Sequence, residues 1–295
     1  MKKLIALLVA LLLALSALTA LADCPRIDAA DYPVVDGSTA TLPLSYLLMQ
    51  TATGVSEDEA RETIHASKTT ESFYQLVNGD ADLLLVYDPS ADAWDIAKEN
   101  GVELLVQSIG LDAPVFLINT DNPVESLTQA EIVDLYAGKI TNWAEVGGND
   151  QPIIAYQRIA NSGSQVMVEA QVMKGVPMMD APRELRPSEM GELIDVISSY
   201  KNTADSIGYS VYYYVNNMYM QDGIKLLAID GVQPTNATIA SGEYPYRQPF
   251  YAIVRADAPE DSPARQLYDF LATQEGRDLV EAAGYVAIPA EGEGE

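Results

Sequence analysis

Two segments of the sequence gather glycine and hydroxyl side chains where a strand is expected to pass into a helix. Residues 36–41 read DGSTAT and precede Pro43, and residues 158–164 read RIANSGS. Backbone N–H groups and hydroxyls at a helix N-terminus lie at the positive end of the helix dipole, where anions bind favourably. Either segment alone is also typical of an ordinary N-cap. Because the two lie in separate halves of the chain, together they favour an anion site.

Arg158 adds a cation to the second segment, four residues before Ser162. Its guanidinium is a planar fork that suits two oxygens of an oxyanion. The alternative is a surface arginine beside an ordinary capped helix.

The composition excludes several other functions. With 43 Asp and Glu against 17 Lys and Arg, the net charge is −26, and such a surface repels nucleic acid and anionic lipid. One His and one Cys cannot build a Cys/His zinc site or an intrachain disulfide. A Ser–His hydrolase would have to use His65, and the sequence lacks a G-x-S-x-G elbow. We therefore expect no enzyme, no metal and no cofactor.

Residues 1–22 have the pattern of a secretory signal peptide. Lys2 and Lys3 precede an apolar stretch at residues 4–21, which ends in a small-residue cleavage site before Asp23. A permanent transmembrane helix is the alternative. Cys24 lies in a sequence that resembles a lipoprotein box, although Asp23 replaces the usual small residue. The protein is thus expected outside the cytoplasmic membrane, either lipid-anchored through Cys24 or free in the periplasmic or extracellular space.

After the signal peptide, short β-rich runs alternate with helical patterns, which predicts an α/β fold with largely parallel sheets. Strands are expected at residues 32–35, 83–87, 102–107, 115–119, 153–157, 207–215, 225–229 and 250–255. Helices are expected at residues 71–78, 91–100, 128–137, 164–174, 188–199, 263–273 and 275–283. Thr128 and Glu131 form a capping box. No Pro-rich linker separates two halves, which favours two lobes that exchange strands.

One family has these motifs in the same order. The most specific string is GKITNWAEVGG at residues 138–148, preceded by SLTQAEI at residues 126–132. Four further strings follow in order: RIANSGS, SIGYS at residues 206–210, TIASGEYP at residues 238–245 and GYV at residues 284–286. Over essentially the whole mature chain, the sequence resembles the phosphate-binding proteins of ABC importers.

The resemblance implies the two-lobed periplasmic-binding-protein fold of type II, with a ligand cleft between lobes joined by crossover strands. One lobe is then expected at residues 24–116 plus about 247–290, and the other at about 117–246. Residues 291–295 are expected to be a disordered acidic tail.

The resemblance also implies ligand contacts, position by position. Ser164 keeps the hydroxyl where the family more often has Thr, and Thr70 corresponds best to a helix-opening Ser, with Thr69 next. Asp88 corresponds to a carboxylate that accepts the proton of a partly protonated anion and repels fully ionised sulfate. The complete expected set is Ser38, Thr39, Ala40, Thr70, Asp88, Arg158, Ser162, Gly163 and Ser164.

We therefore expect a monomeric solute-binding protein that captures inorganic phosphate for an ABC permease in the membrane. Glu71 and Ser72 replace the glycines that usually follow the helix-opening Ser, so another oxyanion or small ligand is an alternative. A sensor or surface protein with a vestigial site, and a secreted phosphatase or hydrolase, are further alternatives.

Overall fold

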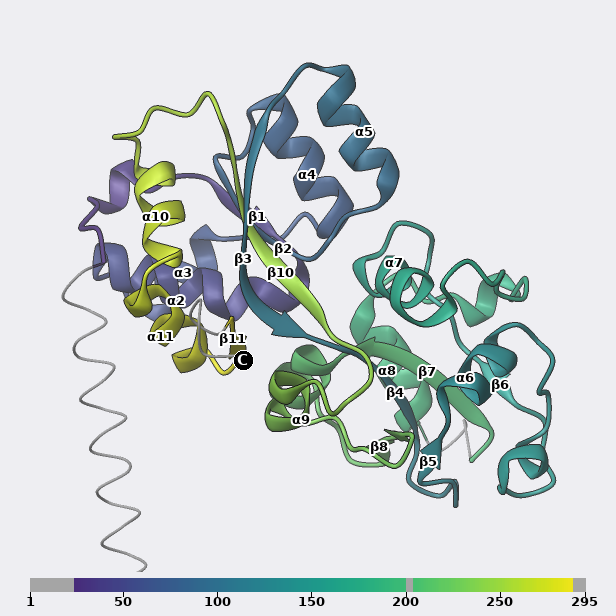
Figure 1. The fold of residues 1–295 in the computed structure, drawn as a ribbon. Coiled ribbons are helices and arrows are strands. Elements are labelled where there is room, and N and C mark those ends of the chain that lie inside the picture. Colours follow the sequence, from purple (N-terminus) through teal and green to yellow (C-terminus); the bar gives the residue numbers. More distant parts are fainter. Residues whose placement is uncertain (1–23, 200–203, 289–295) are drawn as a thin grey trace, which may run out of the picture. The chain divides into compact units, whose positions relative to one another are not determined.

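The computed structural model describes residues 24–199 and 204–288. The chain divides into two compact units (Figure 1): unit 1 is Met1–Gly110 with Pro249–Glu295, and unit 2 is Leu111–Gln248. The chain therefore leaves unit 1 after Gly110 and returns to it after Gln248. The expected signal peptide and acidic tail lie outside the described residues.

Unit 1 is built on a five-stranded sheet with the strand order β1-β2-β10-β3-β11. The strands are β1 (Val35–Gly37), β2 (Leu83–Val86), β3 (Leu104–Asp112), β10 (Gln248–Arg255) and β11 (Val286–Ala287). β1 runs parallel to β2, so the segments that follow these two strands leave the sheet at the same edge. Ser38 and Asp88 belong to those two segments.

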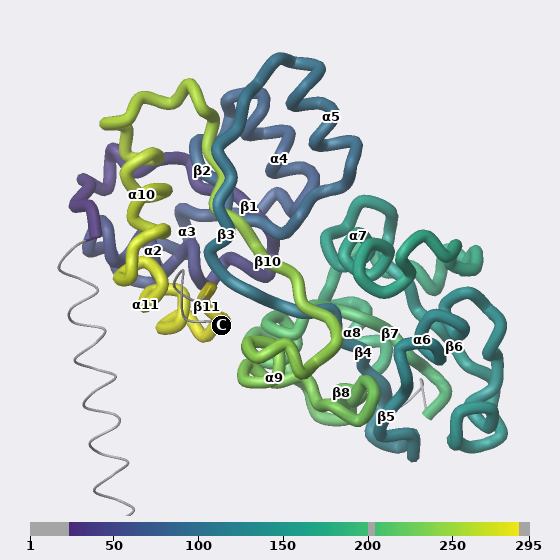
Figure 2. The backbone as a smooth tube through the Cα atoms, viewed as in Figure 1, coloured from purple at the N-terminus to yellow at the C-terminus, as the bar shows by residue number. Residues whose placement is uncertain are grey.

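Helices cover both faces of this sheet. They are α2 (Leu42–Thr53), α3 (Glu57–Thr63), α4 (Thr69–Asn78), α5 (Ala91–Glu99), α10 (Pro263–Leu271) and α11 (Gln274–Ala282), with 3-10 turns η1 (Ala29–Asp31) and η2 (Thr39–Thr41). Figures 1 and 2 show α4 and α5 on one side and α2, α10 and α11 on the other. Phe73 and Leu76 of α4 are fully buried in a cluster with Leu84 and Ile253 of the sheet. Because Ala93 and Ala97 of α5 belong to the same cluster, both helices pack on one face of the sheet.

Unit 2 has a four-stranded sheet with the order β6-β7-β4-β8 and a two-stranded sheet of β5 and β9. The strands are β4 (Pro114–Asn119), β5 (Ser126–Leu127), β6 (Ile154–Ala155), β7 (Ser206–Val211), β8 (Ile224–Leu226) and β9 (Ala228–Ile229). The helices are α6 (Gln129–Tyr136), α7 (Gly163–Val168), α8 (Met190–Ser198) and α9 (Asn236–Ser241), with η3 (Trp143–Val146), η4 (Glu169–Met173), η5 (Arg183–Leu185) and η6 (Tyr214–Met218). The predicted capping box of α6 is confirmed, because Thr128 Oγ1 accepts the Glu131 N–H and Glu131 Oε2 accepts the Thr128 N–H.

The expectation of largely parallel sheets is wrong for two strands. β10 is antiparallel to β2, and β4 is antiparallel to both β7 and β8. β10 carries the chain back from unit 2, and β4 directly continues the chain that has just left unit 1. Neither strand follows a crossover helix of its own sheet, so the alternation of strands and helices does not set its direction.

The first strand begins later than the pattern predicts. It is Val35–Gly37 rather than residues 32–35, because the η1 turn and Pro33 occupy the approach to it. Gly37 is needed within the strand, since an added Cβ would lie 1.8 Å from the Leu85 carbonyl oxygen.

The strand predicted at residues 207–215 ends early, at Val211. Val211 faces Pro114, the first residue of β4, and beyond this pair the Tyr212 N–H donates to the Ala113 carbonyl at 2.9 Å. An Asp112 carboxylate oxygen then accepts the Tyr213 N–H at 3.2 Å, and the chain turns into the helical segment that contains η6. Within the described residues no helix combines the length and apolarity that a bilayer span requires.

Candidate anion-binding site

Ser38 is the centre of a hydroxyl cluster in unit 1. Its Oγ lies 2.8 Å from Thr69 Oγ1 and accepts the Tyr87 N–H at 3.1 Å. The three residues come from the end of β1, the start of α4 and the end of β2. The parallel pairing of β1 and β2 therefore brings together segments that are far apart in the sequence.

The turn that follows Ser38 is held from both sides. The Thr41 hydroxyl shares its single hydrogen between the Ser38 carbonyl at 2.8 Å and the Leu85 carbonyl at 2.5 Å. The Tyr285 hydroxyl, which comes after α11, donates to the Ala40 carbonyl at 2.6 Å. Ala40 is fully buried, whereas Thr39 is half-buried. The turn thus has a fixed shape that keeps the Thr39 and Ala40 backbone near the Ser38 hydroxyl.

Asp36 ties the same turn to the start of α4. Its Oδ1 accepts the Gly37 N–H at 2.6 Å and the Ser67 N–H at 2.7 Å. Lys68 then takes a positive φ of 76°, and α4 begins at Thr69. The sequence favoured Thr70 over Thr69 at this contact. The structure places Thr69 against Ser38 and buries Thr70 beside it in the first turn of α4.

Asp88 lies just after β2, half-buried, at the same edge of the sheet. The indole Nε1 of Trp94 donates to Asp88 Oδ1 at 2.9 Å. Trp94 in turn packs edge-to-face on Phe73, with ring centroids 4.7 Å apart. The carboxylate is therefore held in one orientation by a side chain of α5.

Among the described residues of unit 2, Arg158 is the buried cation, with 4% of its surface exposed. Its Nε donates to the Pro187 carbonyl at 3.2 Å and its Nη2 to the Ser188 carbonyl at 2.8 Å. Nη1 is also buried, and it has no hydrogen-bond partner in the described part of the chain. Burial lowers the pKa of Arg158, but a guanidinium keeps its proton in proteins. One fixed N–H donor group of this cation thus remains for a ligand.

The backbone of Arg158 is fixed as firmly as its side chain. Its N–H is shared between Gln165 Oε1 at 3.1 Å and the Tyr209 hydroxyl at 3.0 Å. The Tyr209 hydroxyl also donates to Gln165 Oε1. A residue of β7 and one of α7 therefore position the arginine.

Ser162, Gly163 and Ser164 form the start of α7. Ser162 is the N-cap, and its Oγ accepts the Gln165 N–H at 3.3 Å. The Ser164 hydroxyl makes no such bond. The residue is 1% exposed, and its Oγ has no partner among the residues described. The helix predicted at residues 164–174 is α7 continued by the π-helix η4, which ends at Met173.

Arg158 and the start of α7 together contain two buried donors without a partner among the described residues, and these indicate what the segment could bind. A buried polar group without a partner costs about 1–3 kcal/mol, so native structures rarely keep one without a reason. Arg158 Nη1 and Ser164 Oγ both offer hydrogen to an acceptor. A cation and a hydroxyl together suit an oxyanion.

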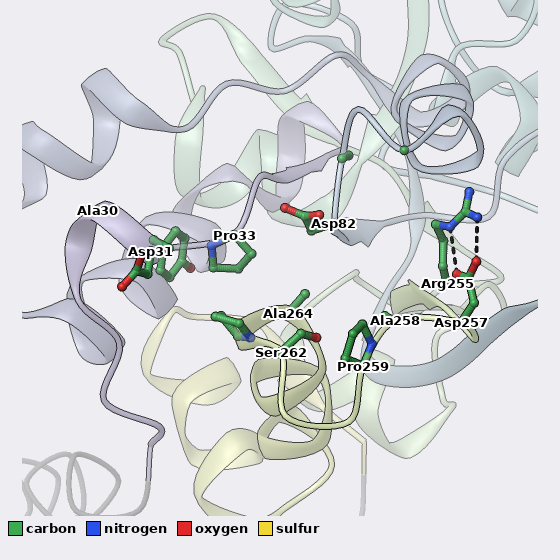
Figure 3. Close-up of a pocket in the computed structure, with 14 residues that line it drawn as sticks. Ala30, Asp31, Pro33, Asp82, Arg255, Asp257, Ala258, Pro259, Ser262 and Ala264 are labelled. Atoms are coloured by element: carbon green, nitrogen blue, oxygen red, sulfur yellow. Dashed lines mark hydrogen bonds and ion pairs between the residues drawn. The ribbon is translucent and has the colours of Figure 1, made fainter.

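A separate cavity in unit 1 does not suit an anion (Figure 3). It has a volume of about 490 Å³ and is lined by Asp31, Asp82 and Asp257 together with Arg255. Arg255 is already engaged by Asp257, with Nε–Oδ1 and Nη2–Oδ2 distances of 3.0 and 2.9 Å. The remaining carboxylates repel an anion. Among the described residues, those of this cavity included, no group of three His, Cys, Asp or Glu side chains could hold a metal ion.

The sequence did not point to two residues that hold the candidate groups of unit 1, one at the Ser38 turn and one at Asp88. Tyr285 lies in the GYV motif, which carried the family resemblance but gave no role for its hydroxyl. Trp94 lies six residues after Asp88, and nothing in the local pattern points to their contact.

The chain belongs to the PBP superfamily, because the family model described as a PBP superfamily domain matches residues 25–275. Among individual relatives, the phosphate-binding protein PstS of Borreliella burgdorferi is 26% identical over 209 residues, which is 69% of this chain and 73% of that protein. The phosphate-binding protein PstS of Bacillus subtilis is 27% identical over 188 residues, covering 63% of this chain and 58% of the relative. The resemblance stated from the sequence is thereby confirmed.

Solved structures support the fold. A putative phosphate ABC transporter substrate-binding protein of Clostridium perfringens, solved with bound phosphate, gives a TM-score of 0.67 at 23% identity, covering 86% of this chain and 98% of that one. An ABC-type phosphate transport receptor of Vibrio cholerae gives a TM-score of 0.63 at 22% identity, covering 86% of this chain and 99% of that one. The α/β, two-lobed binding-protein fold is confirmed. The family is one of solute-binding proteins, so the prediction that the chain is not an enzyme is confirmed by its family.

Proposed function

We propose that the protein captures inorganic phosphate outside the cytoplasmic membrane and delivers it to an ABC permease. The observation that carries the proposal is that two of the buried donors of unit 2, Arg158 Nη1 and Ser164 Oγ, have no partner in the described chain. The names of the two PstS relatives support the choice of phosphate.

The proposed contacts lie in both units. In unit 2, Arg158 supplies charge, while Ser162, Gly163 and Ser164 supply hydroxyl and backbone donors. In unit 1 the Ser38 turn and the start of α4 supply neutral donors. The proposed residues of unit 1 are Ser38, Thr39, Ala40, Thr69 and Thr70, with Asp88 as the acceptor.

Asp88 is the residue that selects phosphate. A carboxylate accepts a hydrogen bond from the proton that phosphate keeps at neutral pH, whereas it repels sulfate, which has none. Trp94 fixes this carboxylate by occupying Oδ1, so Oδ2 is the oxygen that would accept the ligand's proton.

The strongly acidic surface is compatible with anion capture. Exposed charges more than about 10 Å apart are largely screened at ordinary salt, whereas buried donors act at short range in a low dielectric. The net charge of −26 makes nucleic acid an unsuitable partner, and we propose a monomer. We further propose export by the signal peptide at residues 1–22, followed by lipid anchoring through Cys24 or release as a free protein.

Titration calorimetry with phosphate, sulfate and molybdate tests the function. We expect tight binding of phosphate and weak binding of sulfate at the same pH and salt. Preference for sulfate or molybdate would replace phosphate by another oxyanion, and absence of binding to all three would overturn the proposal. Turnover of a chromogenic phosphomonoester would favour a secreted phosphatase instead.

A further inference from the structure

Ser90 has the position of a helix N-cap but does not act as one. It directly precedes α5, with φ −61° and ψ 155°, and its side chain makes no capping hydrogen bond. At the starts of α3 and α10 the serine hydroxyl does cap: Ser56 Oγ accepts the Glu59 N–H, and Ser262 Oγ accepts the Arg265 N–H at 3.3 Å. The Ser90 hydroxyl therefore does not serve the helix that it precedes.

This hydroxyl is nevertheless buried. Ser90 is 8% exposed, and its Oγ has no hydrogen-bond partner in the described part of the chain. It belongs to the same short segment as Asp88, at the edge of the sheet where Ser38 also lies. A buried hydroxyl without a partner, at the positive end of the dipole of a nine-residue helix, suits an anion.

Trp94, at the end of the first turn of α5, contacts the same segment. Trp94 donates its indole N–H to Asp88 Oδ1 at 2.9 Å, and its ring is wedged against Phe73 of α4. The rigid indole leaves the carboxylate little freedom to turn. A single helix therefore carries an unused hydroxyl and the side chain that orients the proposed proton acceptor.

We propose that the first turn of α5 is part of the anion site of unit 1. Ser90 Oγ donates to an oxygen of the bound anion, and Trp94 is a positioning residue that holds Asp88 Oδ2 toward the ligand's proton. This inference rests on the proposed function, since it extends the contact set of the same site. The ligand class is a tetrahedral oxyanion that carries a proton, such as phosphate or arsenate.

The first test is Ser90→Ala, with Ser262→Ala as the matched control. Loss of a hydrogen bond to a charged ligand weakens binding by on the order of tenfold, and it acts on any tetrahedral anion. We expect Ser90→Ala to bind phosphate and sulfate about tenfold more weakly with an unchanged Tm. Ser262→Ala should lower Tm and leave affinity unchanged, because its hydroxyl caps α10. Wild-type affinity in Ser90→Ala would overturn the assignment of Ser90.

The second test is Trp94→Phe, which keeps a ring against Phe73 and removes the N–H. We expect the ratio of phosphate to sulfate affinity to fall by about tenfold or more, because Asp88 is freed to turn away. The control is Trp143→Phe, whose indole donates to the Asp205 carbonyl at 2.9 Å in unit 2. That variant should lose stability and keep the ratio. An unchanged ratio in Trp94→Phe would overturn the positioning role.

These results separate the inference from the function on which it rests. If wild-type protein binds molybdate or sulfate in place of phosphate, the phosphate proposal fails. A tenfold lower affinity of Ser90→Ala for the anion that wild-type protein binds would still support the contact between Ser90 and the ligand. If wild-type protein binds phosphate and both variants match it in affinity and ratio, the α5 proposal alone fails. Binding of no anion by wild-type protein overturns both.

Discussion

Ser38 Oγ and Thr69 Oγ1 lie 2.8 Å apart, although 31 residues separate them in the sequence. Two hydroxyls carry two hydrogens, and their mutual hydrogen bond uses one of them. Ser38 Oγ already accepts the Tyr87 N–H, so that bond does not use the second hydrogen. Whichever hydroxyl donates to the other, one hydrogen is left for a third group. The pair is therefore a single donor built from two segments, and it suits one oxygen of an anion.

Thr69→Val is expected to weaken phosphate binding more than Thr70→Val. Valine keeps the shape of threonine at either position, but at Thr69 it removes half of the hydroxyl pair. We expect a loss of about 1 kcal/mol of stability and an affinity lower by roughly five- to tenfold, in line with one hydrogen bond. Calorimetry and thermal unfolding of both variants give the comparison. A larger loss of phosphate affinity in Thr70→Val than in Thr69→Val would make Thr70 the main contact, as the sequence favoured.

Arg158→Ala is expected to lower phosphate affinity at least tenfold. A charge-assisted hydrogen bond is worth about 1.5–3 kcal/mol, and alanine also leaves the Pro187 and Ser188 carbonyls without their donor. Arg61→Ala is a suitable control, because Arg61 is exposed and pairs with Glu57 on the surface of α3. The control should bind as wild type. Unchanged affinity in the Arg158 variant, measured by calorimetry, would show that another group supplies the cation.

Asp88→Asn is expected to reduce discrimination between phosphate and sulfate. The amide keeps the shape of the carboxylate and can turn its NH₂ toward an unprotonated oxygen, so the repulsion of sulfate is lost. Rejection built on repelling buried groups reaches roughly 10⁴-fold in a dry site. The measurement is the ratio of the two affinities in each protein at fixed pH and salt. Wild-type protein that binds sulfate well, or a ratio that the substitution leaves unaltered, would make Asp88 an ordinary turn residue.

Tyr285→Phe is expected to weaken both the fold and the site. It removes the donor of a 2.6 Å hydrogen bond to the buried Ala40 carbonyl, at a cost of about 1–3 kcal/mol. Affinity should fall as the turn loosens. Tyr246→Phe provides the contrast, because the buried Tyr246 hydroxyl has no partner among the described residues, and its removal should cost little. Equal Tm values for the two variants, with equal affinities, would contradict the role of Tyr285.

Much of the local structure was determined by the sequence alone. The capping box at Thr128 and Glu131 and the stop of α4 at Gly79, with φ 84°, follow from residues within one turn of each other. The sequence also predicted that residues 36–41 and 158–164 could bind an anion, because this depends on the chemistry of glycine, hydroxyl and guanidinium groups within each segment.

Tertiary structure alone decided which of these donors meet, and what holds them. The Tyr285 hydroxyl reaches the Ala40 carbonyl across 245 residues, and Thr69 rather than Thr70 faces Ser38. The antiparallel direction of β10 was likewise not readable from the alternation of strands and helices. The physical reason is that capping and turn formation depend on neighbouring residues, whereas these contacts depend on strand register and helix packing. A shift of one residue in either would exchange one hydroxyl for the next.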